Sequence, residues 1–576
     1  MGVQDAIRRA PRRVPFAFGL LAVGTAALLG TPLAGAAPDR PPPATQQIQI
    51  LSFNDFHGNL QPPAGSSGQV VLPDGTRVDA GGVEYLATHL RALEAENPNT
   101  AVVSAGDLIG ASPLLSALFH DEPTIEAMNA VGLDLNGVGN HEFDEGWREL
   151  RRMQRGGCHP VDGCQDGDGF TGSRFKFLAA NVEFDDGGGR TLFPPYRILD
   201  FDGTKIAFIG MTLEGTPSIV TPTGVEGLSF LDEADTANRY ARFLADRGIH
   251  NIFVLLHEGG VPTGFFDECP AVSGPLVDIV DRMDPEIDAV ISGHTHQGYN
   301  CEINGKLVTS SLSFGRLVTD IDITVDRATR RITEMAARNL IVTRDVAPAS
   351  DMTALIARYN EFAGPIANRV VGSITGDITR APNAAGESQL GDVIADAQLS
   401  ATAPPDLGGS AAAFMNPGGI RADLVFDQQS GNEAPGEVTY GEAFTVQPFG
   451  NSLVVMTLTG AQIDTLLEQQ WCGQDPAFPR ILQPSEGFTY TWDAAAPVCD
   501  RVDASTIAID GVPVDPAGSY RITVNSFLAA GGDNFPVLPE GTDRLGGDVD
   551  LDALEAYVVA NSPVPPGPQD RITRLN

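Results

Sequence analysis

Between residues 48 and 345, short apolar runs alternate with stretches of helical periodicity, and this alternation restricts the possible folds more than any other feature. The runs cover residues 48–53, 100–106, 205–210, 251–256 and 288–293. Each run has the length of one buried strand, and the segments between the runs include stretches that suit helices. The pattern predicts a mixed α/β domain in which helices cover the faces of a sheet.

Polar side chains with metal-binding potential follow these runs at the points where the strands end. They stand in the blocks "NDFHGN", "GD" and "GNHEFD", at the single His257, and in "GHTH". In α/β sheets, ligands bind at the carboxyl ends of the strands. Taken singly, each block is explained equally well by a polar turn or a structural histidine. The ordered set of five instead favours a metal centre.

The residue types in these blocks suit two divalent cations that clamp a phosphate and lower the pKa of a bound water. Zn, Mn or Co would accept imidazole nitrogen together with carboxylate or amide oxygen. We expect Asp107 to bridge the two ions, because a shared carboxylate holds two like charges close together. One ion is assigned Asp55, His57, Asp107 and His296, and the other is assigned Asp107, Asn140, His257 and His294.

His141, which follows the expected ligand Asn140, is not needed as a ligand. Its imidazole is free to donate a hydrogen bond to the developing phosphate charge or to the leaving oxygen. Asp144 lies three residues further on and is expected to orient that imidazole. The remaining histidines are interpreted as surface or structural residues: His89, His120, His159 and His250.

A second unit is expected from about residue 371, after a linking helix at 351–362 that Ser350 is placed to cap. This unit mixes strand-like segments (452–460 and 519–527) with helical ones (390–401 and 461–470). Three of its stretches, "NPGGIR", "QPFGN" and "NSFLAAGGDNF", combine glycine with aromatic and charged residues. They contain Asn416, Arg421, Phe449, Asn451, Phe527 and Asp533. Core phenylalanines, a surface arginine and a simple turn are the alternative interpretation.

The five blocks in their order resemble the calcineurin-like metallophosphoesterases, and the whole chain after its N-terminal segment is similar to the secreted two-domain 5′-nucleotidase and UDP-sugar hydrolase family. The resemblance implies a four-layered α/β catalytic domain at 48–345, a linker helix at 346–370 in which residues 349–370 hold a hinge, and a smaller α/β nucleotide-binding domain at 371–576. It also implies in-line attack of a metal-bound hydroxide on phosphorus, assisted by His141 and Asp144.

In the second domain the resemblance implies that Phe449 and Phe527 stack the nucleobase and that Asp533 holds the ribose. Asn416, Asn451 and Arg421 would line the same site. The chain departs from the family where a further phosphate-contacting arginine is expected. Arg380 stands several residues too early in "TRAPNAAGESQLGD", so it is left out of the predicted site.

The N-terminus indicates export. Four arginines precede an apolar run that ends in "AGA", which predicts a signal peptide at 1–36, followed by a Pro-rich tether at 37–47. A twin-arginine route and an uncleaved membrane anchor are the alternatives; no membrane insertion is expected once the signal is removed. Six cysteines in an exported chain predict the disulfides Cys158–Cys164, Cys269–Cys301 and Cys472–Cys499, with an all-cysteine metal site as the alternative.

The net charge of −37 argues against nucleic-acid binding through a basic face. "DGCQDGDGF" (162–170) resembles part of a calcium loop but lacks the closing glutamate, so we interpret it as a solvated acidic turn. The predicted function is a secreted hydrolase that releases phosphate from 5′-nucleotides and, as a further activity, splits UDP-sugars. A 2′,3′-cyclic-nucleotide phosphodiesterase with 3′-nucleotidase activity, or a non-catalytic nucleotide-binding surface protein, is the alternative. The oligomeric state is left open.

Overall fold

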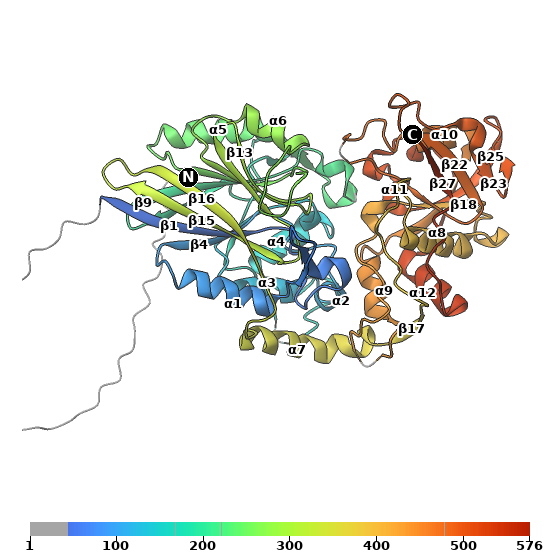
Figure 1. Ribbon diagram of the computed structural model, residues 1–576, viewed down its shortest axis with the longest axis horizontal. Coiled ribbons are helices and arrows are strands. Elements are labelled where there is room, and N and C mark those ends of the chain that lie inside the picture. The colour runs from blue at the N-terminus through green and yellow to red at the C-terminus, as the bar shows by residue number, and fades with distance from the viewer. Residues whose placement is uncertain (1–43, 168, 221, 432, 477) are drawn as a thin grey trace, which may run out of the picture.

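A computed structural model describes residues 44–576, apart from residues 168, 221, 432 and 477. Two α/β domains are joined by the long helix α7 (Ser350–Ala367), which runs along one side of the molecule (Figure 1). The predicted signal peptide and most of the predicted tether lie outside the described residues. Strand β1 (Thr45–Phe53) begins at Thr45 rather than at residue 48, inside the segment assigned to the tether.

The first domain contains two six-stranded sheets, and the first of these has the order β16-β15-β1-β4-β5-β6. Its other strands are β4 (Thr100–Ser104), β5 (Leu135–Gly137), β6 (Lys176–Leu178), β15 (Leu317–Asp326) and β16 (Arg331–Ile341). Strands β1, β4, β5 and β6 are parallel, whereas β15 and β16 add to the edge in antiparallel fashion. The parallel strands are apolar on both faces because both faces are covered.

The second sheet has the order β13-β14-β12-β11-β9-β8. Its strands are β8 (Tyr196–Phe201), β9 (Thr204–Thr212), β11 (Ile252–His257), β12 (Ala289–Ser292), β13 (Gly298–Ile303) and β14 (Lys306–Ser311). The central four, β9, β11, β12 and β14, are parallel. The five apolar runs in the sequence therefore correspond to β1, β4, β9, β11 and β12, as predicted.

The two sheets pack face to face, and helices cover their outer faces, which gives the four layers that were expected. Side chains such as Ile50, Val103 and Phe253 fill the space between the sheets. Helices α1 (Val83–Glu94), α3 (Glu122–Val131) and α4 (Trp147–Arg155) cover the first sheet, with the short α2 (Leu114–Ala117) nearby. Helices α5 (Glu233–Ala245) and α6 (Pro275–Arg282) cover the second.

Helix α7 is present as predicted, but it is longer than residues 351–362 and it is not capped by Ser350. The N-cap position is Ala349, and no side chain accepts a hydrogen bond there. Ser350 is already helical, so its hydroxyl is not in the extended position from which a cap reaches back to the first turn. The helix buries Met352, Ile356 and Tyr359 against the first domain, where the ring of Tyr359 lies 4.8 Å from that of Phe119.

The second domain is built on a five-stranded sheet with the order β21-β18-β25-β20-β26. Its strands are β18 (Ala412–Met415), β20 (Ser452–Thr459), β21 (Gln483–Pro484), β25 (Ser519–Asn525) and β26 (Thr542–Val549). Helices α8 (Gln389–Thr402), α9 (Tyr440–Val446), α10 (Gly460–Glu468) and α12 (Asp550–Asn561) pack around it. A smaller sheet contains β22 (Phe488–Asp493), β23 (Ala508–Ile509), β24 (Val512–Pro513) and β27 (Ile572–Leu575), and β17 (Val370–Ser373) pairs with β19 (Glu437–Thr439).

All three predicted disulfides are formed: Cys158–Cys164, Cys269–Cys301 and Cys472–Cys499. The acidic segment after Cys158 is not simply solvated, because Asp166 pairs with Arg358 of α7 and Asp162 contacts two histidines. Within the described part of the chain, no helix combines the length and apolarity that a membrane span requires.

Candidate metal centre and substrate cavity

The predicted donors of the first domain meet at one edge of the paired sheets. Asp55 and His57 follow β1, Asp107 follows β4, Asn140 follows β5, His257 ends β11, and His294 and His296 follow β12. Five of these residues have positive φ angles: Asp55, His57, Asp107, His294 and His296. A left-handed backbone costs free energy in residues other than glycine. Its recurrence here shows that the fold holds these side chains in set directions.

The donors form two groups, and the first contains Asp55, His57 and His296. The Nε2 atoms of His57 and His296 lie 3.1 Å apart, and His296 Nε2 lies 3.4 Å from Asp55 Oδ1. Both Asp55 and His57 are fully buried. Three donor atoms therefore converge on one point, in the set that was assigned to the first ion apart from the bridging carboxylate.

The second group contains Asp107, His257 and His294. His257 Nε2 lies 3.0 Å from Asp107 Oδ2, and Asn140 Oδ1 lies 3.0 Å from His294 Nδ1. Asp107 also lies 3.6 Å from Nε2 of His57, which belongs to the first group. The carboxylate of Asp107 thus stands between the two groups, at the position expected of a bridge.

The electrostatics of the buried donors fit cations. His257 Nε2 is buried beside the carboxylates of Asp107 and Asp55, at 3.0 and 4.0 Å. Burial disfavours a charged ring here, but Asp107 outweighs it and raises the pKa of His257 to about 10, so a cation bound at this nitrogen would replace a proton. Burial lowers the pKa values of His57 and His294 well below the ordinary value, which leaves neutral rings with a lone pair to offer. Burial disfavours the charged form of Asp107, but the surrounding imidazoles, His257 foremost, outweigh it and hold its pKa well below the usual range. Neutral imidazole and ionised carboxylate are the forms that bind metals.

Backbone carbonyls fix the orientation of two of the imidazoles. Nδ1 of His57 lies 2.8 Å from the carbonyl oxygen of Gly110, and Nδ1 of His257 lies 2.7 Å from that of Ala105. Such contacts select the tautomer that leaves Nε2 free for a metal.

Glu142, in the middle of "GNHEFD", is a structural residue that the sequence interpretation did not explain. Its buried carboxylate accepts hydrogen bonds from the backbone N–H groups of Asp107, Leu108 and Gly139, at 2.9, 2.9 and 2.7 Å. Burial, followed by the charge of Asp107, raises its pKa to about 8. Glu142 thereby joins the loops that follow β4 and β5. Its place within "GNHEFD" was the only available signal, and that signal does not indicate a bracing role.

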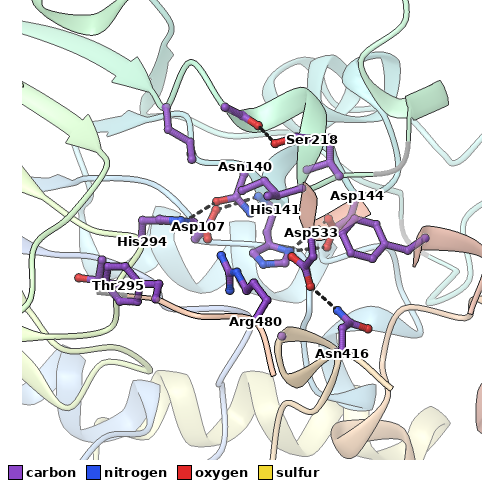
Figure 2. A pocket seen from close by; sticks show the side chains of 18 of the residues that line it. Asp107, Asn140, His141, Asp144, Ser218, His294, Thr295, Asn416, Arg480 and Asp533 are labelled. Atoms are coloured by element: carbon purple, nitrogen blue, oxygen red, sulfur yellow. Dashed lines mark hydrogen bonds and ion pairs between the residues drawn. The ribbon is translucent and has the colours of Figure 1, made fainter. Parts of the chain in front are cut away.

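His141 and Asp144 form the pair that was expected. His141 Nδ1 lies 2.9 Å from Asp144 Oδ2, and the backbone N–H of His141 donates to Asp107 Oδ1 at 2.9 Å. Burial disfavours a charged ring, but Asp144 and Asp107 outweigh it and hold the pKa of His141 above its ordinary value. The imidazole faces the cavity beside the donors (Figure 2).

All six predicted second-domain residues line the same cavity, whose volume is about 410 Å³. They are Asn416, Arg421, Phe449, Asn451, Phe527 and Asp533. Asn416 Nδ2 donates to Asp533 Oδ2 at 2.7 Å, opposite the His141–Asp144 pair (Figure 2). Asn525 in turn donates to Asn416 Oδ1, and Ser526 donates to Asn451 Oδ1. These bonds fix the polar side chains before any ligand binds.

The cavity also contains residues that the sequence interpretation missed. Phe478 and Arg480 line it, from the loop that the Cys472–Cys499 disulfide closes, and Glu258, next to His257, lines the first-domain side. No motif marks this loop, so only its position in the fold could reveal it. Arg380, which was left out of the predicted site, donates to the carbonyl oxygen of Arg421 and to Ser67 Oγ of the first domain.

Comparison with known proteins agrees with this architecture. The calcineurin-like phosphoesterase family model matches residues 48–298, and the 5′-nucleotidase C-terminal domain model matches residues 370–540. A cell wall protein, Lmo0130 from Listeria monocytogenes, is 32% identical over 93% of this chain and 69% of its own length. The chain belongs to the two-domain 5′-nucleotidase family of calcineurin-like phosphoesterases.

Two further similar proteins are informative. Endonuclease YhcR from Bacillus subtilis is 33% identical over 89% of this chain, but the chain spans only 39% of that relative's length. A solved structure, the 5′-nucleotidase precursor from Thermus thermophilus, superimposes with a TM-score of 0.75 at 25% identity. The superposition covers 92% of this chain and 100% of the Thermus thermophilus chain. The arrangement of the two domains is therefore that of a 5′-nucleotidase.

Proposed function

We propose that the chain removes phosphate from 5′-nucleotides in the cavity that its two domains share. The observation that carries the proposal is that metal-type donors and nucleotide-type recognition residues line one cavity. One small molecule could then place its phosphate at the metal-type donors, such as Asp107 and His294, and its nucleoside at Phe527 and Asp533. Splitting of UDP-sugars, which also contain a phosphate joined to a nucleoside, belongs to the same proposal.

Two divalent cations, of the class of Zn, Mn or Co, are proposed for the donor groups. Asp55, His57, Asp107 and His296 would hold one, and Asp107, Asn140, His257 and His294 would hold the other. When bound, such cations neutralise phosphate charge and lower the pKa of a water molecule. The protein's own contribution is a buried, prearranged donor set, with Asp107 positioned to be shared.

His141 is proposed to donate a hydrogen bond or a proton to the oxygen on which charge develops. The geometry supports this role because the ring faces the cavity and Asp144 lies 2.9 Å from its other side. A raised pKa keeps a larger fraction of the ring protonated near neutral pH, as a proton donor requires. Asp144 also accepts from the backbone N–H of Ala111, so its carboxylate is fixed while it orients His141.

The second domain is proposed to recognise the nucleoside. Phe449 and Phe527 would stack the base, since stacking on an aromatic face is worth about 1–3 kcal/mol per base. The Asp533 carboxylate would accept hydrogen bonds from ribose hydroxyls, with Asn416 and Asn451 beside it. Arg421 is proposed to contact phosphate, because a guanidinium pairs with phosphate through two parallel bonds. Burial lowers the pKa of Arg421, and Arg380 nearby lowers it further.

The test is a substrate panel on protein stripped of metal and reconstituted with Mn²⁺, Co²⁺ or Zn²⁺. We expect phosphate release from AMP that stops with chelator and returns with metal. Faster turnover of 2′,3′-cyclic AMP and 3′-AMP would favour the cyclic phosphodiesterase alternative. Tight nucleotide binding with no turnover under any metal would overturn the proposal and favour a binding protein.

We also propose that the protein acts outside the cytoplasm. Three disulfides support this, because they persist in oxidising compartments. The similarity to a protein named for the cell wall agrees with it. The signal peptide at 1–36 and the domain limits at 48–345, 346–370 and 371–576 remain part of the proposal, which N-terminal sequencing of the exported protein and limited proteolysis would test.

A further inference from the structure

A second group of imidazoles and carboxylates lies outside the site described above. It contains His120, Glu145, Glu149 and His159, each of which offers one ligand atom, and these atoms all lie within 4.8 Å of one another. Three separate segments contribute to it: the turn before α3, the start of α4, and the hairpin closed by the Cys158–Cys164 disulfide. Convergence from three segments distinguishes this group from an acidic stretch on one surface loop.

The two imidazoles of this group lie against each other. Their rings stack with centroids 3.8 Å apart and an interplanar angle of 18°. Two protonated rings at this distance repel each other, so the pair can hold little positive charge by itself. Both rings are mostly covered, with side chains 16% and 15% exposed.

The carboxylates around the two imidazoles carry more negative charge than the neighbouring cationic side chains neutralise. His120 Nδ1 lies 2.7 Å from Glu145, and Asp162 lies 3.0 Å from His120 Nε2 and 3.2 Å from His159 Nδ1. Glu149 is held by Arg152, which also pairs with Glu122. Even with Arg152 and one protonated histidine, carboxylates outnumber cations here.

We propose that His120, His159, Glu145 and Glu149 bind a third divalent cation, separate from the pair at Asp107. Two imidazole nitrogens with two carboxylate oxygens form a donor set that suits zinc or a similar transition metal. The carboxylate of Asp162 would lie behind His120, in the position where carboxylates orient metal-binding histidines, and the backbone N–H of Asp162 donates to His159 Nδ1 at 3.2 Å.

The proposed site adjoins the catalytic turn. A cavity of about 240 Å³ is lined by His120, Glu145 and Glu149, by His141 and Asp144, and by Phe449 of the second domain. Glu145 follows Asp144 directly in the chain. A cation bound to Glu145 would therefore tie the turn that carries the His141–Asp144 pair to the disulfide-closed hairpin, and its role would be to position that turn.

The test measures zinc binding at the His120/His159 group in a variant whose donor groups around Asp107 have lost ligands. In a His57→Asn/Asp107→Asn/His257→Asn background, which removes ligands from both donor groups of the first centre, Zn²⁺ titrated by calorimetry should still bind, at about one equivalent per chain. Adding His120→Asn and His159→Asn should abolish this binding, whereas His250→Asn, in another histidine–carboxylate pair at 2.9 Å, should not. The hydrogen bond to Glu145 raises the pKa of His120 to about 9, so zinc must displace a proton and the titration should be run at pH 8.

Retention of the bound equivalent after His120 and His159 are replaced would overturn the proposal. Absence of any binding in the His57→Asn/Asp107→Asn/His257→Asn background would also overturn it, provided that the circular dichroism spectrum is native. A Glu145→Gln variant provides a milder check, because it keeps the side-chain shape and should weaken Zn²⁺ binding at least tenfold. The readout is metal binding alone, so its outcome does not depend on whether the chain hydrolyses nucleotides.

Discussion

The imidazole of His141 and the phenyl ring of Phe449 stack across the interdomain cavity, with centroids 5.7 Å apart and an interplanar angle of 19°. His141 belongs to the metal edge of the first domain, and Phe449 belongs to the second domain. The guanidinium of Arg421 lies 5.8 Å from the centroid of the same phenyl ring. A nucleobase that stacks on Phe449 must therefore share this ring with His141 or displace it. For this reason a substitution at Phe449 would disturb catalysis and recognition together.

Replacing His141 with alanine should lower kcat by about 10²–10⁴-fold, the usual range for a positioned acid–base group. The metal content, measured by elemental analysis, should not change, because His141 reaches Asp107 only through its backbone N–H. His250→Ala is the matched control and should keep full activity. If His141→Ala instead loses metal, the assignment of His141 as a non-ligand is wrong.

Phe527→Ala tests base stacking more cleanly than any change at Phe449. It should raise KM for AMP by about tenfold, since removal of one stacking face costs about 1–3 kcal/mol. Hydrolysis of p-nitrophenyl phosphate, which has no base, should be unaffected. Phe243→Ala, at a partly exposed phenylalanine of α5, is the control. An equal loss on both substrates would indicate a folding role for Phe527.

Removal of metal should lower the melting temperature as well as abolish activity. Cations bound only to the folded state add RT ln(1 + [L]/Kd), which is about 2.7 kcal/mol at a hundredfold excess over Kd. Asp107→Asn should remove most of this metal-dependent stabilisation, because Asp107 lies within reach of both donor groups. Calorimetric scans of both proteins with and without chelator would measure it. A shift in Asp107→Asn as large as in the unmodified protein would contradict the bridging role.

Two of the three disulfides should differ clearly in their contribution to stability. Cys269–Cys301 spans 32 residues and Cys158–Cys164 spans six. The loop-entropy relation predicts that removing the longer crosslink costs about 1.5 kcal/mol more in free energy of unfolding. Urea unfolding of the two paired Cys→Ser variants checks this order. A larger loss for Cys158–Cys164 would mean that native-state contacts, rather than chain entropy, dominate.

Asp550 should make the protein less stable as the pH rises from about 4 to about 7. Burial raises its pKa to about 7, against an ordinary value of 3.8, although its Oδ1 accepts from the N–H of Leu551. Between these two values the folded state binds more protons than the unfolded state, so stability falls with rising pH. Asp550→Asn should remove this dependence and gain roughly 2–4 kcal/mol at pH 8.

Melting temperatures measured from pH 4 to pH 8 would test the Asp550 prediction. The two curves should approach each other toward the acid end, where the carboxyl is protonated in the folded state and increasingly protonated in the unfolded state as well. An exposed aspartate of the first domain provides the control, as Asp246→Asn at the end of α5 should leave the pH dependence as it is. Parallel curves for Asp550→Asn and the unmodified protein would contradict the prediction.

The sequence by itself determined the α/β class and the donor set of the first domain. Each donor follows an apolar run, and parallel strands bring their carboxyl ends to one edge. The position of each donor directly after a strand therefore predicted that Asp55, Asp107 and His294 lie together, although they span 240 positions of the sequence. The cysteine pairs were equally local, since each cysteine joins the next one along the chain.

Only the tertiary structure decided which other side chains reach the site. Phe478 and Arg480 line the cavity from a loop that carries no sequence motif. Glu142 accepts hydrogen bonds from the backbone after two strands. His120 stacks on His159, which lies in a disulfide-closed hairpin. Sequence spacing carries no information about such contacts, because they depend on how the domains and loops pack, and packing is set by many distant side chains at once.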